Sequence, residues 1–394
     1  MPRMLAQRVT YFSESVIREM TRLANRHGAI NLAQGMPDFE TPQELKDAAC
    51  RAIQDGFNQY AITWGAKPLR DAISAKTART YPGWQPNPET EITVTCGATE
   101  GMVAAMLALL DPGDEVIVFE PFYENYGPDA ILTGATPRYV SLEPPDWSFD
   151  PDALRGAVSP RTRAIVLNSP HNPTGKVFTR GELDQIAAVA QESDLLVFTD
   201  EIYEHLVYEG EHVPMATLPG MRERTVAVNS VSKTYSVTGW RVGWVIAPAA
   251  LTSGIRKVHD FLTVGAAAPL QAAAAVALGL PAGYYDGLLA GYRARRDTLV
   301  PALEGAGFIV WRPAGAYYVM TDIAGLTDLD DTAFARQLIL DPGVAAVPGS
   351  SFYAHSELGR TKLRFAFPKK LETLRAAADR LSAVREVEPV APGP

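Results

Sequence analysis

The feature that most constrains the fold of this chain is a regular alternation of strand-like and helix-like segments between residues 91 and 230. Short apolar runs such as 115–119 and 164–168 have the length and the branched residues of strands that are buried on both faces. Longer segments with helical periodicity, such as 98–110 and 181–192, separate them. This alternation predicts an α/β fold with a mostly parallel central sheet and helices on both of its faces.

The segments on either side predict a second, smaller unit. Three helices are expected before the alternation, at 13–27, at 41–55 and around 69–73, and Thr41 with Glu44 predicts a capping box for the second. A helix at 282–305 follows it, with strand candidates at 308–312, 316–321 and 361–367 that indicate a smaller α+β domain. The predicted division is an N-terminal arm with part of the small domain (1–40), a large domain (41–284), a small C-terminal domain (285–385) and a disordered tail (386–394).

Composition narrows the classes of partner. A formal net charge of −9 over 394 residues argues against nucleic acid or an anionic membrane as the main partner. The two cysteines, Cys50 and Cys96, cannot form a disulfide framework, which favours a reducing compartment. The first residues lack the apolar core of a signal peptide, and the run 264–280 is too weakly apolar to span a membrane. We therefore expect a cytoplasmic protein.

A lysine-containing turn follows the last strand of the alternation. Lys233 stands among Ser230, Ser232, Thr234 and Ser236, and Arg241 comes eight residues later. This pattern suits a covalent carbonyl cofactor that carries a phosphate, since the amine can form a Schiff base while the hydroxyls and Arg241 hold the anion. A solvated polar turn with a surface lysine explains the stretch equally well when it is taken alone.

The other strand ends decide between these interpretations, because the active sites of open α/β sheets lie at the carboxyl ends of the strands. The groups expected there, besides Lys233 and Arg241, are an anion-binding turn at Ala98 and Thr99, an aromatic ring at Tyr123, the amide of Asn172, and Asp200 with Tyr203. Each has an ordinary structural explanation when considered by itself. Together they match the parts of pyridoxal 5′-phosphate, including Asp200 for a protonated ring nitrogen.

With these motifs in place, the chain resembles the class I/II aminotransferases of the fold-type I pyridoxal-phosphate family over essentially its whole length. The matching stretches are NLAQGMPDF (31–39), NQY (58–60), NSPHNPTG (168–175), DEIY (200–203), SVSK (230–233) with GWR (239–241), and RFAF (364–367). It is most similar to the kynurenine, glutamine and methionine aminotransferase branch. Actinobacterial N-succinyldiaminopimelate aminotransferases share many of the same stretches.

The resemblance implies roles for individual residues. The catalytic residues would be Lys233, Asp200 and Tyr203. The cofactor-binding residues would be Ala98, Thr99, Tyr123, Asn172, Asp200, Tyr203, Ser230, Lys233 and Arg241, with Tyr60 from a neighbouring subunit of a homodimer. The substrate would be held by Arg364 and Asn172 at its α-carboxylate, with Gly35 at the mouth of the site and Ile17 in an apolar wall. No metal site is expected.

The predicted activity is that of a pyridoxal-phosphate-dependent transaminase, which exchanges an amino group between an amino acid and a 2-oxo acid. The apolar wall favours methionine, glutamine, kynurenine or aromatic donors, and no second arginine can be assigned from the sequence to a distal carboxylate. The alternatives are an N-succinyldiaminopimelate or aspartate-type aminotransferase and a cysteine-conjugate C–S β-lyase. A non-catalytic effector-binding module is disfavoured, because no basic DNA-binding segment precedes residue 31.

Overall fold

The computed structural model describes residues 5–12 and 14–386. In this part of the chain, two sheets organise the molecule. The large sheet has eight strands in the order β2-β9-β8-β7-β6-β3-β4-β5. Its strands are β2 (Ile92–Thr95), β3 (Glu115–Glu120), β4 (Thr136–Glu143), β5 (Ser148–Phe149), β6 (Thr162–Asn168), β7 (Leu196–Asp200), β8 (Thr225–Ser230) and β9 (Gly243–Ile246). The central pairs from β4 to β8 are parallel, which confirms the predicted α/β fold.

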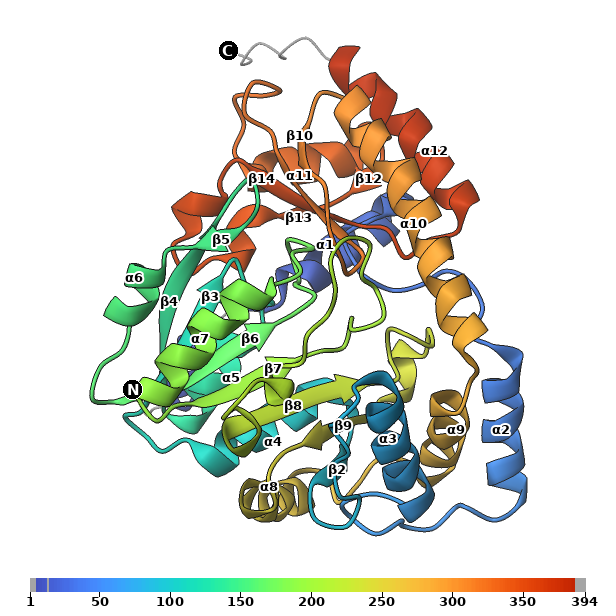
Figure 1. Ribbon diagram of the computed structural model, residues 1–394. Coiled ribbons are helices and arrows are strands. Elements are labelled where there is room, and N and C mark those ends of the chain that lie inside the picture. The colour runs from blue at the N-terminus through green and yellow to red at the C-terminus, as the bar shows by residue number, and fades with distance from the viewer. Residues whose placement is uncertain (1–4, 13, 387–394) are drawn as a thin grey trace.

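Alternating side chains of the central strands are buried on opposite faces of the large sheet. Val116 and Val118 of β3 pack with α4 (Gly97–Leu109) and α5 (Tyr126–Thr133), and α8 (Ala249–Leu262) lies against α4 on the same face. Ile117 and Phe119 point the other way, toward α7 (Arg180–Glu192) and α6 (Pro151–Gly156). This period of two explains the continuous apolar runs in the sequence, because both faces of the sheet are covered (Figure 1).

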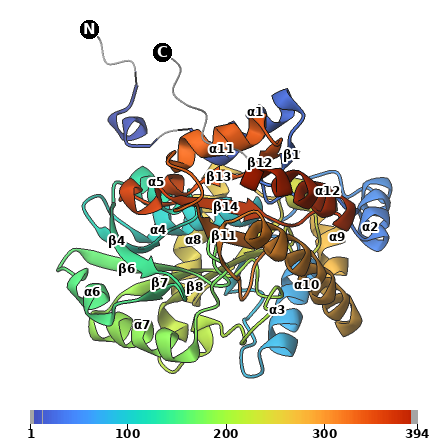
Figure 2. The ribbon, with the colours of Figure 1, turned by 90° about the horizontal axis from the view of Figure 1, so that it is seen from above.

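The small sheet has four strands and lies at one end of the large unit (Figures 1 and 2). Its strands are β10 (Ile309–Trp311), β11 (Tyr318–Asp322), β14 (Lys362–Ala366) and β13 (Val347–Pro348). A separate parallel pair joins β1 (Ile30–Asn31) to β12 (Val344–Ala345), so the N-terminal segment pairs with the C-terminal part of the chain. The helices α10 (Ala282–Gly305), α11 (Asp331–Leu340) and α12 (Leu371–Leu381) complete this unit. The exact domain boundaries stay a prediction.

The helix α1 (Val16–His27) belongs to the small unit. Its Ile17, Met20 and Ala24 are buried at helical spacing, and the Ser15 side chain caps its amino end. The helix was expected to begin at residue 13, which lies outside the described residues. The predicted disordered tail, 386–394, lies outside them as well, apart from residue 386 at the end of a short 3-10 helix.

The predicted capping box at Thr41 is wrong. The helix α2 (Gln43–Gln54) begins after Pro42 and has no side-chain cap. The Thr41 hydroxyl instead donates a hydrogen bond to the Ser236 carbonyl at 2.9 Å. The Thr41 hydroxyl therefore donates to a distant carbonyl and does not accept from an amide of its own helix, and this bond ties the start of α2 to the turn that carries Lys233.

Two further helices, α3 (Lys67–Thr80) and α9 (Ala268–Leu278), pack against each other beside the large sheet. The helix α9 lies within the weakly apolar run 264–280, and its Ala273, Ala274 and Ala277 are inaccessible to solvent. Across the described residues, the helices are too short or too polar to cross a lipid bilayer.

Candidate active site

A cavity of about 410 Å³ lies where the parallel strands of the large sheet end. The pairing of the strands brings their carboxyl ends to a common edge of the sheet, since Asn168 at the end of β6 lies opposite Asp200 at the end of β7. The neighbouring β8 ends at Ser230, and Lys233 follows it in the next turn. The chain thus places an amide, a carboxyl group and an amine around one enclosed space.

Asp200 is the buried carboxyl group at the centre of this edge. Its Oδ2 accepts a hydrogen bond from the Tyr126 hydroxyl at 2.7 Å, and its Oδ1 accepts one from the Ile202 amide at 3.3 Å. Burial raises the pKa of Asp200 to about 6, while the bond from Tyr126 lowers it. At pH 7 the carboxyl group is therefore mostly ionised, and it lacks a cation in hydrogen-bond contact among the described residues.

Asp129 brings a second carboxyl group to the same cavity. It lies on α5 one turn after Tyr126, is 5% exposed, and its Oδ2 has no hydrogen-bond partner in the described structure. Burial, together with the charge of Asp200, raises the pKa of Asp129 to about 8. This carboxyl group therefore carries its proton at neutral pH.

Lys233 faces the two acids from the opposite turn. Its amine lies 5.8 Å from the centre of the Tyr317 ring. Its surroundings lower the pKa of the ammonium group to about 8, chiefly through desolvation, whereas the charge of Asp200 favours the protonated form and the charges of Arg241 and Arg364 oppose it. The amine is therefore available as a base close to neutral pH.

The turn before α4 forms a cradle around the Arg241 guanidinium. Gly97 has a φ of +82°, and a Cβ there would lie 2.3 Å from Nη2 of Arg241. A Cβ at Gly243 would lie 2.6 Å from the amide nitrogen of Ala98. Both glycines are needed for this close approach. The cradle is suited to a phosphate because it gathers hydrogen-bond donors and a positive charge. These are the amides at the start of α4, the hydroxyls of Thr99 and Ser230, and the Arg241 guanidinium.

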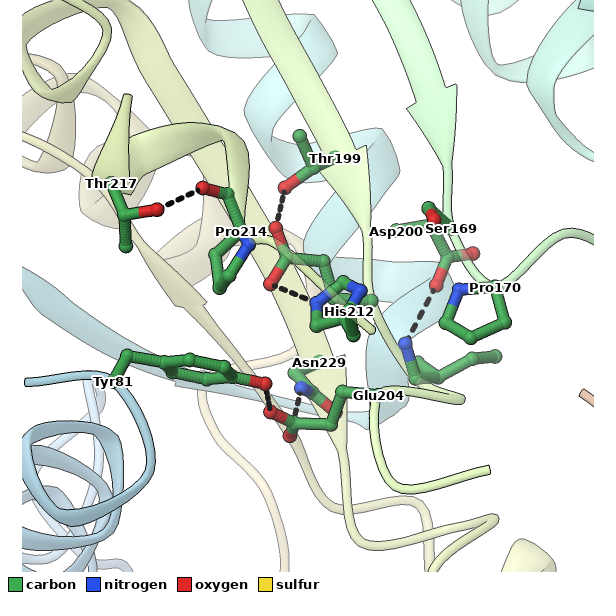
Figure 3. A network of polar contacts seen from close by, with 12 residues as sticks. Tyr81, Ser169, Pro170, Thr199, Asp200, Glu204, His212, Pro214, Thr217 and Asn229 are labelled. Carbon is green, nitrogen blue, oxygen red and sulfur yellow. Dashed lines mark hydrogen bonds and ion pairs between the residues drawn. The ribbon is translucent and has the colours of Figure 1, made fainter. Parts of the chain in front are cut away.

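A buried polar network, which includes Tyr81, Glu204 and Asn229, holds the end of β8 in place (Figure 3). Asn229 Nδ2 donates to the Glu204 carboxylate at 2.6 Å, and its Oδ1 accepts from the Ser230 amide at 2.7 Å. Tyr81 also donates to Glu204, and Lys76 forms a buried ion pair with it. The ammonium group of Lys76 and these hydrogen bonds hold the pKa of Glu204 well below its usual range despite burial. The charged carboxylate therefore fixes Asn229 and, through it, Ser230.

Arg364 connects the small sheet to the cavity. It lies on β14, is 1% exposed, and donates to Asn172 Oδ1 at 2.9 Å and to the Ala33 carbonyl at 2.6 Å. The rings of Tyr318 and Phe352 lie 4.3 and 4.7 Å from its guanidinium carbon. Its Nε is buried without a partner in the described residues. This guanidinium is rigidly held and has unused donor capacity, as a carboxylate receptor requires.

Nine of the residues predicted from the sequence line the cavity together: Ala98, Thr99, Tyr123, Asn172, Asp200, Tyr203, Ser230, Lys233 and Arg241. Four others lie elsewhere in the single chain. Tyr60 is 88% exposed, Ile17 is packed in the core of the small unit, and Arg364 stands behind Asn172 and Tyr318. Gly35 lies against Tyr318, since a Cβ there would be 2.5 Å from its hydroxyl oxygen. The absence of a side chain at Gly35 thus allows the close approach of Tyr318.

The structure adds residues that the sequence did not reveal. Tyr126 and Asp129 reach the cavity from α5, and Arg18 and Gln34 reach it from the N-terminal segment. The spacing of Tyr126 and Asp129 places them on one helix face. That spacing was the available signal, but it does not tell which face of the helix meets the sheet.

Comparisons with known proteins agree with this geometry. The family model for aminotransferase class I and II matches residues 27–381. The chain is 42% identical to a probable N-succinyldiaminopimelate aminotransferase of Mycobacterium tuberculosis, over 97% of this chain and 99% of that protein. It is 40% identical to the methionine aminotransferase of Escherichia coli, over 93% and 95% of the two chains. The solved structure of the aspartate aminotransferase of Thermus thermophilus with maleate, 34% identical, superposes with a TM-score of 0.90 over 97% and 100%.

The raised pKa of Asp129 predicts a pH-dependent gain in stability when this carboxyl group is removed. Between about pH 4 and 8 the folded protein keeps this proton while the unfolded chain loses it, so stability falls by up to ~1.4 kcal/mol per pH unit. Asp129→Asn removes that loss. In the protein freed of bound small molecules, thermal unfolding should show a higher Tm for Asp129→Asn at pH 8 and almost no difference at pH 4.

The exposed Asp328 provides a matched control, because Asp328→Asn makes the same chemical change at the surface. A Tm difference for Asp129→Asn that is equally large at pH 4 and pH 8 would contradict the assignment of a protonated, buried acid.

Proposed function

The chain belongs to the aminotransferase class I and II family, and we propose that it transfers amino groups with pyridoxal 5′-phosphate held in the cavity around Lys233. Enzymes of this family depend on that cofactor in general. The observation that carries the proposal is the meeting of a half-buried amine, a buried carboxylate and an arginine-lined anion cradle in one cavity.

The residues fit the cofactor part by part. The cradle of Gly97, Gly243 and Arg241 would hold the phosphate, and a Cβ at either glycine would displace it, because it would collide with the Arg241 guanidinium or with the Ala98 amide. Asp200 is a buried acid without a cationic contact, which a protonated ring nitrogen would supply. The further residues that would hold the cofactor are Ala98, Thr99, Tyr123, Asn172, Tyr203 and Ser230. When bound, pyridoxal phosphate supplies a carbonyl that condenses with amines and a ring that withdraws electrons.

The catalytic role of Lys233 is proton transfer through its Nζ. With a pKa of about 8, roughly one-tenth of the free amine is neutral at pH 7, which is enough for a general base. It would take the proton from the α-carbon of the substrate and hold it for return. Asp200 would hold the ring nitrogen of the cofactor with its negative charge, and the hydrogen bond from Tyr126 favours that charge against burial.

The substrate carboxylate would be bound where the two sheets meet. Arg364 and Asn172 are already joined by a 2.9 Å hydrogen bond, so both are oriented before a substrate arrives. Tyr203 and Tyr318 are joined by a 2.9 Å bond between their hydroxyls and close the same side. In the proposed function, these contacts would fix the substrate carboxylate and so orient the α-carbon toward Lys233.

The substrates are an L-amino acid and a 2-oxo acid. We propose methionine, glutamine, kynurenine or aromatic donors, as the names of the methionine and kynurenine aminotransferase relatives suggest. The aromatic ring of Tyr123 provides an apolar surface for such side chains. N-succinyldiaminopimelate is the alternative donor, because a probable N-succinyldiaminopimelate aminotransferase is 42% identical to this chain.

We further propose that two copies of the chain form the working enzyme. A patch of exposed apolar side chains surrounds Tyr60: Phe57, Ile62, Phe261, Leu262 and Val264. The two segments of this patch lie together, because His259 contacts the Thr63 carbonyl at 2.8 Å. Contiguous apolar patches of this kind mark interaction surfaces. In a dimer, Tyr60 would reach the phosphate cradle of the other copy.

Light scattering tests the dimer. The purified protein should have twice the 42.7 kDa mass of one chain. Phe261→Asp places a charge in the patch and should shift the measured mass toward that of the monomer. Leu340→Asp, at an exposed apolar position elsewhere, should leave the measured mass unchanged. A monomeric wild-type protein at micromolar concentration would refute the shared site.

Replacing the proposed base tests the proposed reaction. Lys233→Ala removes the amine while its neighbours keep their positions, so the first half-reaction with an amino acid should slow by ~10²–10⁴-fold. The rate is measured from the change in cofactor absorbance after rapid mixing. Lys257→Ala, at an exposed position, is the control. Turnover of Lys233→Ala at the wild-type rate would exclude this lysine as the base.

A further inference from the structure

Two buried tyrosines from different units of the molecule meet at the central cavity. Tyr203 comes three residues after the end of β7 in the large sheet, and Tyr318 is the first residue of β11 in the small sheet. Both are buried, and both line the cavity that contains Lys233. Their hydroxyl oxygens lie 2.9 Å apart, and their rings meet edge to face with centroids 5.8 Å apart. The wall of the cavity thus contains a hydrogen bond that joins the two units.

Neighbouring residues hold the Tyr318 ring and its hydroxyl in place. Tyr318 on β11 is a diagonal neighbour of Arg364 on β14, and the guanidinium carbon lies 4.3 Å from the centre of the Tyr318 ring. The backbone of Gly35 packs against the hydroxyl itself, since a Cβ there would lie 2.5 Å from its oxygen. The Tyr317 hydroxyl donates to the Gly35 carbonyl at 2.8 Å and fixes this backbone. Close packing therefore keeps the Tyr318 hydroxyl directed at Tyr203.

The two hydroxyls carry two protons, and the bond between them uses one, so the other can be donated to a further acceptor. The charges nearby indicate which hydroxyl keeps it. Burial raises the pKa of Tyr318, and the charge of Arg364 opposes this rise. Burial also raises the pKa of Tyr203, where the charge of Asp200 adds to the rise. Tyr318 is therefore the better donor of the pair, and the Tyr203 proton is the one left for another acceptor in the cavity.

Pyridoxal phosphate offers such an acceptor, because its ring carries a phenolic oxygen beside the carbonyl carbon. In the proposed function, Asp200 binds the ring nitrogen and the arginine-lined cradle binds the phosphate, which leaves the phenolic oxygen for another donor. A hydroxyl that accepts one hydrogen bond donates a stronger one, because the two bonds polarise each other. With Tyr318 behind it, Tyr203 would therefore stabilise the anionic form of the phenolic oxygen better than it could alone.

We propose that Tyr318 is a positioning residue for the cofactor: its hydroxyl donates to Tyr203 and so directs the Tyr203 proton toward the phenolic oxygen. This inference rests on the proposed function, since it concerns the cofactor of the same cavity. Tyr318 acts through Tyr203 and not on the cofactor directly. Because Tyr318 also lies against Arg364, it links the ionisation of the cofactor to the part of the small unit that would bind the substrate carboxylate.

A pH titration of the holoenzyme without substrate tests this role, because the visible absorbance of the bound cofactor changes when the cofactor loses a proton. The hydrogen bond from Tyr203 favours the deprotonated form and so lowers the midpoint of the titration. Tyr318→Phe keeps the ring against Arg364 but removes the hydroxyl, and it should raise the midpoint by roughly 0.3–1 pH unit. Tyr208→Phe is the matched control. It removes a buried hydroxyl that donates to the Ala316 carbonyl, away from the residues that line the cavity, and should leave the midpoint unchanged.

A double variant shows whether Tyr318 acts through Tyr203. Tyr203→Phe alone should raise the midpoint by more than Tyr318→Phe does. Adding Tyr318→Phe to Tyr203→Phe should cause no further shift, since the hydroxyl through which Tyr318 acts is then absent. An unchanged midpoint in Tyr318→Phe, or a shift of the same size with and without the Tyr203 hydroxyl, would overturn the proposal. A wild-type protein that shows no absorbance from bound pyridoxal phosphate would instead refute the proposed function.

Discussion

The structure depends on the burial of opposite charges where parallel strands end. Taking a carboxylate or an ammonium group out of water costs several kcal/mol for each ion unless a partner compensates it. Glu204 is compensated within the chain by Lys76, Tyr81 and Asn229. Asp200 is compensated only in part, by hydrogen bonds from Tyr126 and the Ile202 amide, and desolvation lowers the pKa of the nearby Lys233 although the charge of Asp200 opposes this shift. The first network holds the strand ends in place, and the incomplete second one is where the proposed cofactor would bind.

The second requirement is that two sheets meet over this edge. Arg364 comes from the small sheet and Asn172 from a loop of the large one, and their hydrogen bond crosses the boundary. The N-terminal segment completes the contact, because Ala33 accepts from Arg364 while Gln34 and Arg18 face the cavity. In the proposed function, the large sheet supplies the groups that bind the cofactor, whereas the small unit and the N-terminal segment supply groups for the substrate. Such a division would allow one fold to serve different donors, as the names of the methionine and kynurenine aminotransferase relatives suggest.

The sequence predicts most of the large sheet because its signals are local. Apolar runs, turn glycines and the polar residue after each strand lie within a few residues of one another, so Asp200 and Lys233 could be placed at one edge. Features that depend on contacts between distant segments could not be predicted from the sequence. The Thr41 hydroxyl donates to the Ser236 carbonyl and does not cap its own helix. The sequence also does not tell that the face of α5 with Asp129 points into the cavity. Arg18 was missed for a related reason, since only the packing of α1 shows that Arg18 lines the cavity while the neighbouring Ile17 is buried in the core of the small unit.

The central claim is that Lys233 is the amine to which the cofactor is joined. Reduction of the holoenzyme with borohydride, followed by peptide mass spectrometry, measures this directly. The mass of a reduced pyridoxal phosphate should appear on the peptide that contains Lys233 and be absent from that of Lys176, which is buried in an ion pair with Glu182. Modification of another lysine, with Lys233 left unmodified, would contradict the account.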